Sequence, residues 1–299
     1  MQNKQATSFM EATGVIQYNM TNDYMFRYIL QKNKKVLKGL ICSLLHLQPE
    51  QIKNVEITNP IDLSEDIDGK DFILDINVLL NDNTQINLEM QVENKHNWPD
   101  RSLAYLCRSF DQLYRGQEYE EALPVIHIGF LDYTLFPDVP EFYAKNMLMN
   151  VKNHEIYSDK FILRVLNLKT LEDNSIEKEP ADLYYWAKLF KATTWEEIKM
   201  IAKNSETLQE ASETLYSMHC EETIRGMARA RQDYNRLHNY LDHKIATLEA
   251  DNEKLTSDNE KLSSDNEKLS SDNEKLSSAL TDKDAEIAKL QALVEQLKK

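Results

Sequence analysis

The sequence predicts an α/β domain, built on a mixed sheet flanked by helices, with a helical extension and a C-terminal coiled coil after it. Three observations predict this fold class. Residues 71–93 hold two runs that alternate apolar and polar positions, as strands do because successive side chains point to opposite faces. Residues 124–136 contain a short apolar run typical of a buried strand. After Pro180 no proline follows and Gly226 is the only glycine, which favours helix to the end of the chain.

The elements can be assigned in chain order. Apolar residues at helical spacing predict a helix over residues 23–47. A loop is expected at residues 59–69 and a second helix from Trp98 to about Gly116, because Pro99 suits a first helical turn. A further strand is expected at residues 161–168. The expected order is therefore helix, two strands, helix, strand, loop, strand. We expect domain boundaries at 1–175, 176–240 and 241–299.

The two strands of residues 71–93 are expected to form a hairpin. Asn81, Asp82 and Asn83 separate them, and Asn83 tolerates the left-handed conformation that a three-residue loop requires. Such a loop pairs Leu80 with Thr84. That register predicts which polar side chains meet across the strands.

In this register Asp75 lies opposite Glu89, and Gln91 shares the face of Glu89. Like charges directly opposite each other destabilise a ladder. A divalent cation would remove the repulsion and take the carboxylate oxygens as ligands. The alternative is the solvated polar face of an edge hairpin. We favour a metal site.

These residues belong to a wider pattern in the sequence. Around Asp75 and the triplet Glu89, Met90 and Gln91 it comprises NDYMFRYIL at 22–30, RSLAYL at 101–106 and LYRGQEYEEALPVIHIGFLDYTLF at 113–136. The pattern resembles the Rpn group of recombination-promoting nucleases and transposases, which belongs to the PD-(D/E)xK nuclease superfamily. The resemblance covers about the first 170 residues.

The resemblance implies a restriction-endonuclease-like fold for residues 1–175 and a magnesium-dependent DNA endonuclease. By this analogy Asp75 and Glu89 bind Mg²⁺ and the Met90 carbonyl adds a further oxygen. Gln91 stands where the superfamily usually has lysine. Because glutamine carries no charge, it can orient a water molecule only through hydrogen bonds.

Arg101 is the favoured phosphate-binding residue. A row of polar side chains at helical spacing predicts a guanidinium-lined face that contacts DNA, or else a solvated helix face. Its members are Arg101, Tyr105, Arg108, Gln112 and Arg115, with Leu103, Leu106, Phe110 and Leu113 opposite. Asp23 either caps the first helix or assists the metal site. His127, in an apolar run, is expected to be a core histidine with its hydrogen bonds satisfied.

Composition limits the other possibilities. The net charge of −15 argues against broad, non-specific affinity for nucleic acid. Cys42, Cys107 and Cys220 are scattered singly, which favours neither disulfides nor zinc and suggests a reducing cytoplasm. No apolar run approaches the ~20 residues that a membrane span needs.

The C-terminal part carries heptads that predict a parallel homodimeric coiled coil. The leucines fall at the position called d, where Lys283 interrupts them: Leu241, Leu248, Leu255, Leu262, Leu269, Leu276, Leu290 and Leu297. The a positions are Ile245, Asn252, Asn259, Asn266, Asn273, Leu280, Ile287 and Val294. Together with the family resemblance, which implies a metal-dependent endonuclease acting on double-stranded DNA, the heptads predict a dimeric enzyme. The alternatives are a degenerate nuclease that binds DNA without cutting it, and a dimerisation or regulatory protein.

Overall fold

The protein is described by a computed structural model that covers residues 8–59, 76–111, 113, 116–174, 177 and 180–297. It divides into two compact units, Met1–Tyr234 and Asn235–Lys299. The first unit therefore groups most of the expected helical extension with the α/β part.

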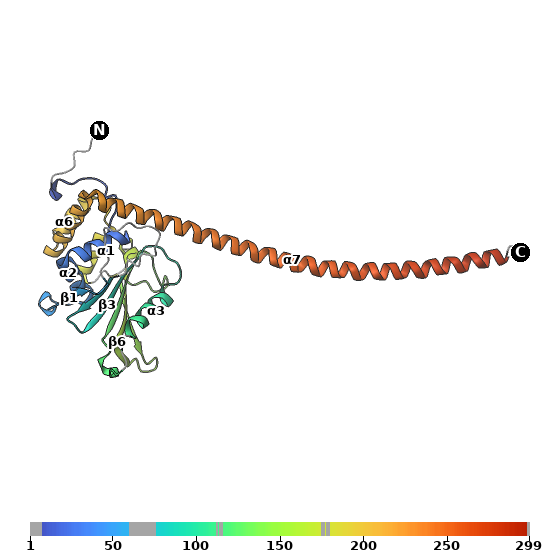
Figure 1. The fold of residues 1–299 in the computed structure, drawn as a ribbon, viewed down its shortest axis with the longest axis horizontal. Coiled ribbons are helices and arrows are strands. Elements are labelled where there is room, and N and C mark those ends of the chain that lie inside the picture. Colours follow the sequence, from blue (N-terminus) through green and yellow to red (C-terminus); the bar gives the residue numbers. More distant parts are fainter. Residues whose placement is uncertain are drawn as a thin grey trace, which may run out of the picture. The chain divides into compact units, whose positions relative to one another are not determined.

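A mixed six-stranded sheet forms the centre of the first unit in the described ranges, in the order β1-β2-β3-β4-β6-β5 (Figure 1). β3, β4 and β6 run parallel, and the other pairs are antiparallel. The strands are β1 (Val55–Ile57), β2 (Ile76–Leu80), β3 (Thr84–Gln91), β4 (Val125–Leu131), β5 (Tyr143–Met149) and β6 (Ile156–Asn167). The predicted α/β class with a mixed sheet is confirmed.

β1 and β5 were not predicted from the sequence, and both are edge strands. β1 is only three residues long, too short for a periodic signal. β5 leaves most of its side chains at least partly exposed, so it lacks the alternation that burial imposes. Its pairing with β6 is irregular between Met147 and Leu148 and between Leu148 and Met149.

Helices cover the sheet, and one predicted helix is in fact two. Residues 23–47 break at Asn33, whose extended backbone ends α1 and whose side chain accepts hydrogen bonds from the amides of Lys35 and Val36 at the start of α2. The helix from Trp98 ends at Phe110 rather than near Gly116. The helices are α1 (Asp23–Lys32), α2 (Lys34–Leu45), α3 (Trp98–Phe110), α4 (Ala181–Lys191), α5 (Trp195–Ala202), α6 (Glu206–Cys220) and α7 (Glu222–Leu297).

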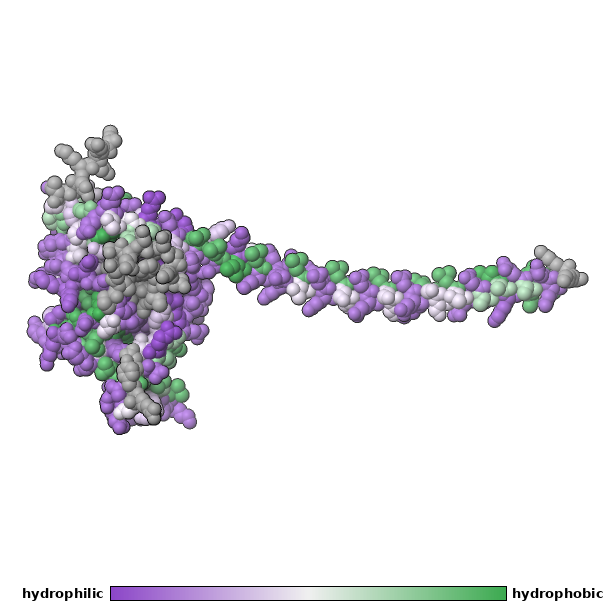
Figure 2. All heavy atoms as spheres, viewed as in Figure 1, coloured by the Kyte–Doolittle hydropathy of each residue, from purple (hydrophilic) through white to green (hydrophobic). Residues whose placement is uncertain are grey.

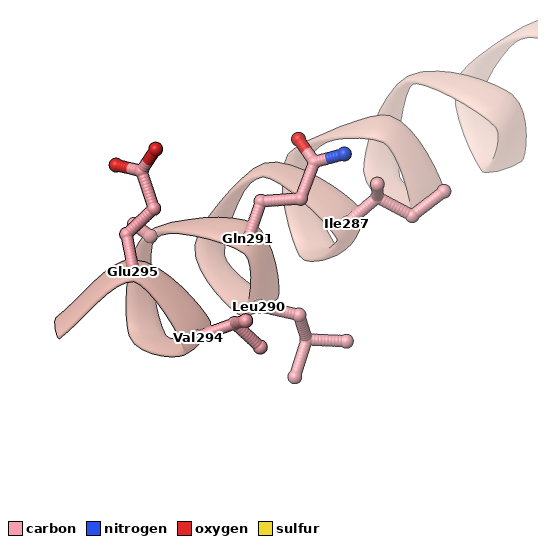
Figure 3. A pocket seen from close by; sticks show the side chains of 6 residues that line it. Ile287, Leu290, Gln291, Val294 and Glu295 are labelled. Carbon is pink, nitrogen blue, oxygen red and sulfur yellow. The ribbon is translucent and has the colours of Figure 1, made fainter. Parts of the chain in front are cut away.

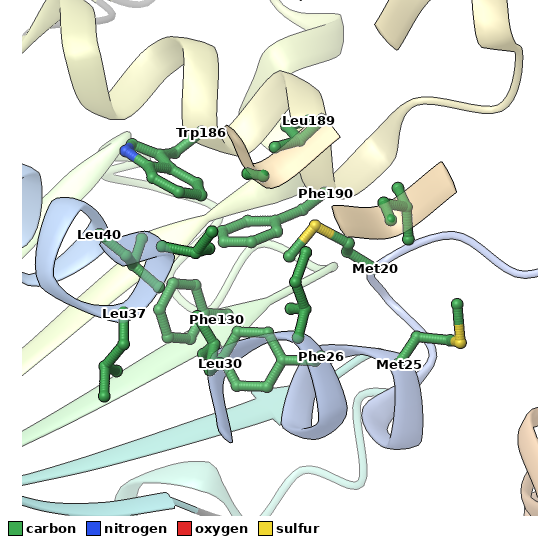
Figure 4. Close-up of a cluster of buried hydrophobic side chains, with 14 of the residues drawn as sticks. Met20, Met25, Phe26, Leu30, Leu37, Leu40, Phe130, Trp186, Leu189 and Phe190 are labelled. Atoms are coloured by element: carbon green, nitrogen blue, oxygen red, sulfur yellow. The ribbon is translucent and has the colours of Figure 1, made fainter. Parts of the chain in front are cut away.

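The main core lies on the sheet face that α1, α2 and α4 cover (Figure 4). The rings of Phe26, Phe130 and Phe190 contact one another with centroids 5.1 to 5.8 Å apart. On the other face, Trp98 of α3 packs against Leu131 and Val165. Because both faces are covered, polar side chains on the α3 face are buried beneath that helix.

The predicted hairpin register is confirmed in the described residues, where Leu80 pairs with Thr84 and Ile76 with Leu88. The loop conformation was predicted wrongly. Asn81 and Asp82 take the left-handed region, with φ of 50° and 60°, instead of Asn83. Two successive residues of positive φ match the twist of a hairpin, and the Asn81 side chain is fixed by the amide of Lys53 at 2.7 Å.

The last helix, α7, runs without interruption from Glu222 to Leu297. Its first turns belong to the first unit, where Asn22 donates to the Ala228 carbonyl at 3.1 Å. In the second unit the leucines at the d positions are exposed and form a green row along the helix (Figure 2). Among the described residues, no helix combines the length and apolar character required to cross a bilayer.

Candidate functional site

The candidate site is centred on Glu89, near the carboxyl end of β3. Its side chain is buried, with the residue 6% exposed. Arg101 of α3 donates from Nε to Glu89 Oε1 at 2.7 Å. A carboxylate is rarely buried unless it is paired, and this charge-assisted hydrogen bond provides a partner. α3 thus places a cation directly against the acid that the sequence analysis selected.

Gly129 makes room for this arrangement. It pairs with Glu89 across the parallel β3–β4 ladder, and Trp98 packs over it. A Cβ atom at this position would lie 2.0 Å from Cζ2 of Trp98. Only glycine lets the indole approach the sheet so closely, so Gly129 sets the distance between α3 and the site.

Gly129→Ala is therefore expected to lower the free energy of unfolding by about 1–3 kcal/mol, because the added methyl group overpacks the space beneath Trp98. The measurement is chemical denaturation of both proteins. Gly226→Ala is the matched control, since no atom lies within 4 Å of its added Cβ in the α7 interior. There alanine should be neutral or stabilising by up to about 1 kcal/mol. Equal stability of Gly129→Ala and the wild type would contradict the packing argument.

His127 lies beside Glu89 on the same face of the sheet and is fully buried. The rings of Trp98 and Tyr105, both on α3, lie next to its ring, with centroids 5.4 and 5.9 Å away. Burial, and secondly the charge of Arg101, lower the pKa of His127 to about 3. The imidazole is therefore neutral at pH 7, and its 3.6 Å contact between Nε2 and Glu89 Oε2 is not an ion pair.

The prediction that His127 has its hydrogen bonds satisfied was wrong. Neither ring nitrogen has a hydrogen-bond partner among the described residues. A buried polar atom without a partner costs about 1–3 kcal/mol, and such atoms are uncommon in native cores. β4 supplies this histidine from a distant part of the sequence, so its relation to Glu89 could not be read from local spacing.

Two more polar atoms are buried near Glu89 without a hydrogen-bond partner in the described part of the chain, Oε1 of Gln91 and the hydroxyl of Tyr133. Burial raises the pKa of Tyr133 to about 12, with the negative charge of Glu89 adding to the effect and that of Arg101 opposing it. Gln91 also donates from Nε2 to the Glu93 carbonyl at 3.1 Å. Tyr133 was not selected from the sequence, where it is one of many tyrosines.

The donor set fits a divalent metal ion. Glu89 offers carboxylate oxygen, Gln91 an amide oxygen and His127 a neutral imidazole, all of which are metal ligands in proteins. Asp75 lies outside the described residues. Within the described residues, no cluster of three or more His, Cys, Asp or Glu side chains could hold a metal ion. These residues alone thus provide a partial ligand set.

The other selected residues lie as follows. Asp23 is the first residue of α1, but Asn22 is the cap and accepts from the Met25 amide. Asp23 instead accepts from Arg231 Nε of α7 at 2.8 Å. Met90 is partly buried and packs its side chain on the main core.

The α3 stripe differs from the prediction. Leu103 is exposed, whereas Tyr105 is half-buried and its ring contacts that of His127. The guanidinium groups of Arg101 and Arg108 lie 5.2 and 6.0 Å from the Tyr105 ring. Gln112 and Arg115 lie outside the described residues. The row of five is thus established only for its first three members.

Comparison with protein families gives two matches. Residues 20–244 match the model of the PD-(D/E)XK nuclease family transposases. Residues 249–290 are similar to the C-terminal part of FAZ1. No curated protein and no solved structure matched. The first match covers most of the chain, including β3, α3 and the residues around Glu89, and accords with a mixed sheet flanked by helices in a restriction-endonuclease-like arrangement. The chain therefore belongs to the PD-(D/E)XK nuclease family transposases.

Proposed function

We propose that this protein is a metal-dependent endonuclease that cleaves phosphodiester bonds in double-stranded DNA and thereby promotes recombination. The proposal rests on one buried carboxylate, that of Glu89. Next to it lie Oε1 of Gln91 and the two ring nitrogens of His127, which have no hydrogen-bond partner in the described part of the chain. A cation site requires several such oxygen and nitrogen atoms close together. Membership of a nuclease family makes DNA the expected substrate.

Asp75 and Glu89 would hold Mg²⁺, with the Met90 carbonyl as a further oxygen. The bound ion would polarise the scissile phosphate and lower the pKa of a water molecule. Asp75 itself lies outside the described residues, and its place opposite Glu89 is the one that the register predicted from the sequence gives it. The two acids would then approach the ion from adjacent strands.

Arg101 would bind the phosphate while keeping Glu89 in place. Its Nε is engaged by Glu89 Oε1, but its side chain is 42% exposed. A guanidinium has five N–H donors, so one side chain can contact a carboxylate and a phosphate oxygen together. Arg101 thereby supplies positive charge that Gln91, which orients the attacking water, does not.

The coiled coil would bring two such domains together. Leucines at d, such as Leu262 and Leu269, are 61% exposed in the single chain. Near the end of α7, Leu290 and Val294 project to one side and Gln291 and Glu295 to the other (Figure 3). These apolar side chains form a seam that a second copy would bury.

The charges favour parallel pairing. Four g positions are acidic and the e positions of the central repeats carry hydroxyls. In a parallel pair g faces e of the partner, whereas in an antiparallel pair g faces g. Antiparallel pairing would therefore set aspartates against each other. The g residues are Asp251, Asp258, Asp265 and Asp272, and the e residues are Thr256, Ser263, Ser270 and Ser277.

A plasmid-nicking assay tests the proposal. The full chain is expected to convert supercoiled DNA to open-circular and linear forms with Mg²⁺ or Mn²⁺ and to lose this activity in EDTA. Asp75→Ala should abolish it, because one of two carboxylate ligands is removed. The absence of cutting by the wild type with either ion would refute the enzymatic proposal.

The second candidate is a nuclease-like protein that binds DNA without cutting it. Gln91 in the usual position of lysine favours it, because the charge nearest the attacking water is missing. The same assay, combined with a DNA gel-shift experiment, separates the two. A gel shift without nicking in the presence of any metal ion would establish DNA binding alone. If the protein neither shifted nor nicked DNA, a dimerisation or regulatory role would be favoured.

A further inference from the structure

The least explained group in the site is the imidazole of His127. The side chain is fully buried, and neither ring nitrogen has a hydrogen-bond partner among the described residues. Trp98 and Tyr105 contact its ring in tilted arrangements. These contacts explain a flat side chain at this position, but phenylalanine would serve that purpose without two buried polar atoms. A ligand of Nε2 would account for one of these two unpartnered atoms.

The position of Glu89 indicates what this ligand is. His127 Nε2 lies 3.6 Å from Glu89 Oε2, too far for a hydrogen bond. Two atoms that each lie ~2.0–2.2 Å from one metal ion are separated by roughly 3 Å at octahedral angles and roughly 3.3–3.6 Å at tetrahedral angles, so the observed separation is at the upper end of what one shared ion spans. The guanidinium group of Arg101 binds the other carboxylate oxygen, Oε1. A metal ion between Glu89 Oε2 and His127 Nε2 would therefore not compete with Arg101 for the same oxygen atom.

We propose that His127 Nε2 is a ligand of the divalent ion held by Glu89. This inference rests on the proposed metal-dependent nuclease. A nitrogen ligand changes which ion the site prefers. Mg²⁺ takes oxygen ligands and keeps much of its water, whereas imidazole suits first-row transition ions, which bind nitrogen more strongly. The site would thus select Mn²⁺ or a later transition ion over Mg²⁺.

Pulsed electron paramagnetic resonance of the full chain loaded with Mn²⁺ tests this directly. The experiment detects ¹⁴N coupled to the bound ion, and calorimetry with Mn²⁺ and Mg²⁺ gives the affinities. The wild type should show a histidine nitrogen signal. His127→Phe preserves a ring next to Trp98 and Tyr105 and removes both nitrogen atoms. It should lose the signal and bind Mn²⁺ about 10- to 100-fold more weakly, with a smaller loss for Mg²⁺.

His154→Asn is the matched control, because His154 is exposed and its φ of 58° suits asparagine. It should bind Mn²⁺ as the wild type does. Wild-type protein that binds Mn²⁺ without nitrogen coupling would overturn the inference while leaving the nuclease proposal intact, as would unchanged affinity in His127→Phe. If the wild type bound neither ion and did not cut DNA, both would fall. Should His127→Phe not fold, the wild-type nitrogen signal decides alone.

Discussion

Glu89→Gln is expected to reduce DNA nicking by about 10³-fold or more. The substitution preserves the size of the side chain and an oxygen that Arg101 can bind, but it removes the negative charge that would hold the metal ion. A catalytic metal contributes several kcal/mol to transition-state stabilisation, and each 1.36 kcal/mol is a factor of ten in rate. The rate of plasmid relaxation at saturating Mg²⁺ or Mn²⁺ measures this effect, and calorimetry should show weaker binding of the ion.

Glu93→Gln is the matched control for this experiment. Glu93 is an exposed acid just beyond β3, and the substitution leaves unchanged the backbone carbonyl that accepts from Gln91. The nicking activity of Glu93→Gln should remain within about twofold of the wild type, as expected for a substitution of an exposed surface residue. Both variants should unfold cooperatively. Full activity in folded Glu89→Gln would show that Glu89 is not a metal ligand.

Leu262→Lys combined with Leu269→Lys is expected to separate the proposed dimer. Each leucine is 61% exposed in the single chain, and burying a leucine contributes about 1.5–3 kcal/mol. Four leucines are lost per dimer and four ammonium groups enter the seam. The dissociation constant should rise by more than about 10³-fold, which sedimentation velocity at micromolar concentration would show as a shift to monomer.

The control places the same charges elsewhere on the same helix. Ser264→Lys with Ser271→Lys changes f positions, which face away from the seam in a parallel dimer, and should leave the dimer intact. If the proposed pairing of sites governs cutting, the leucine variant should still nick one strand but produce less linear product. A wild-type protein that is monomeric, or a leucine variant that remains dimeric, would exclude the seam as the dimer interface.

Much of the fold followed from local patterns. The period of two in β2 and β3 and the loop between them were sufficient for the register, because a slip by one residue would turn Ile86 and Leu88 away from the main core. The break at Asn33 was not predicted, since the apolar spacing continues across it. The break becomes visible in the structure, where the Asn33 side chain caps the start of α2. β5 was missed because an edge strand has little burial to leave a pattern.

The site followed from the sequence in part. Glu89, Gln91 and Arg101 were selected from spacing and family resemblance, and the structure brings Arg101 against Glu89. The role of His127 depends on the neighbour relation of β3 and β4 and on the rings that α3 brings over it. No local signal carries this information, because whether a buried nitrogen has a partner depends on residues far apart in the chain. Asp23 is a second example, because its hydrogen-bond partner, Arg231, lies in the last helix and could not be inferred from the local sequence.

The irregular pairing of β5 bears on how the molecule behaves at high concentration. A regular edge strand offers free amides and carbonyls to any extended chain, and such edges initiate aggregation. β5 carries Lys145, and its ladder shifts register on both sides of Leu148. A charged side chain and a distorted edge are devices that discourage an incoming strand. The exposed apolar residues Leu148 and Met149 thus lie where a neighbouring molecule cannot extend the sheet in register.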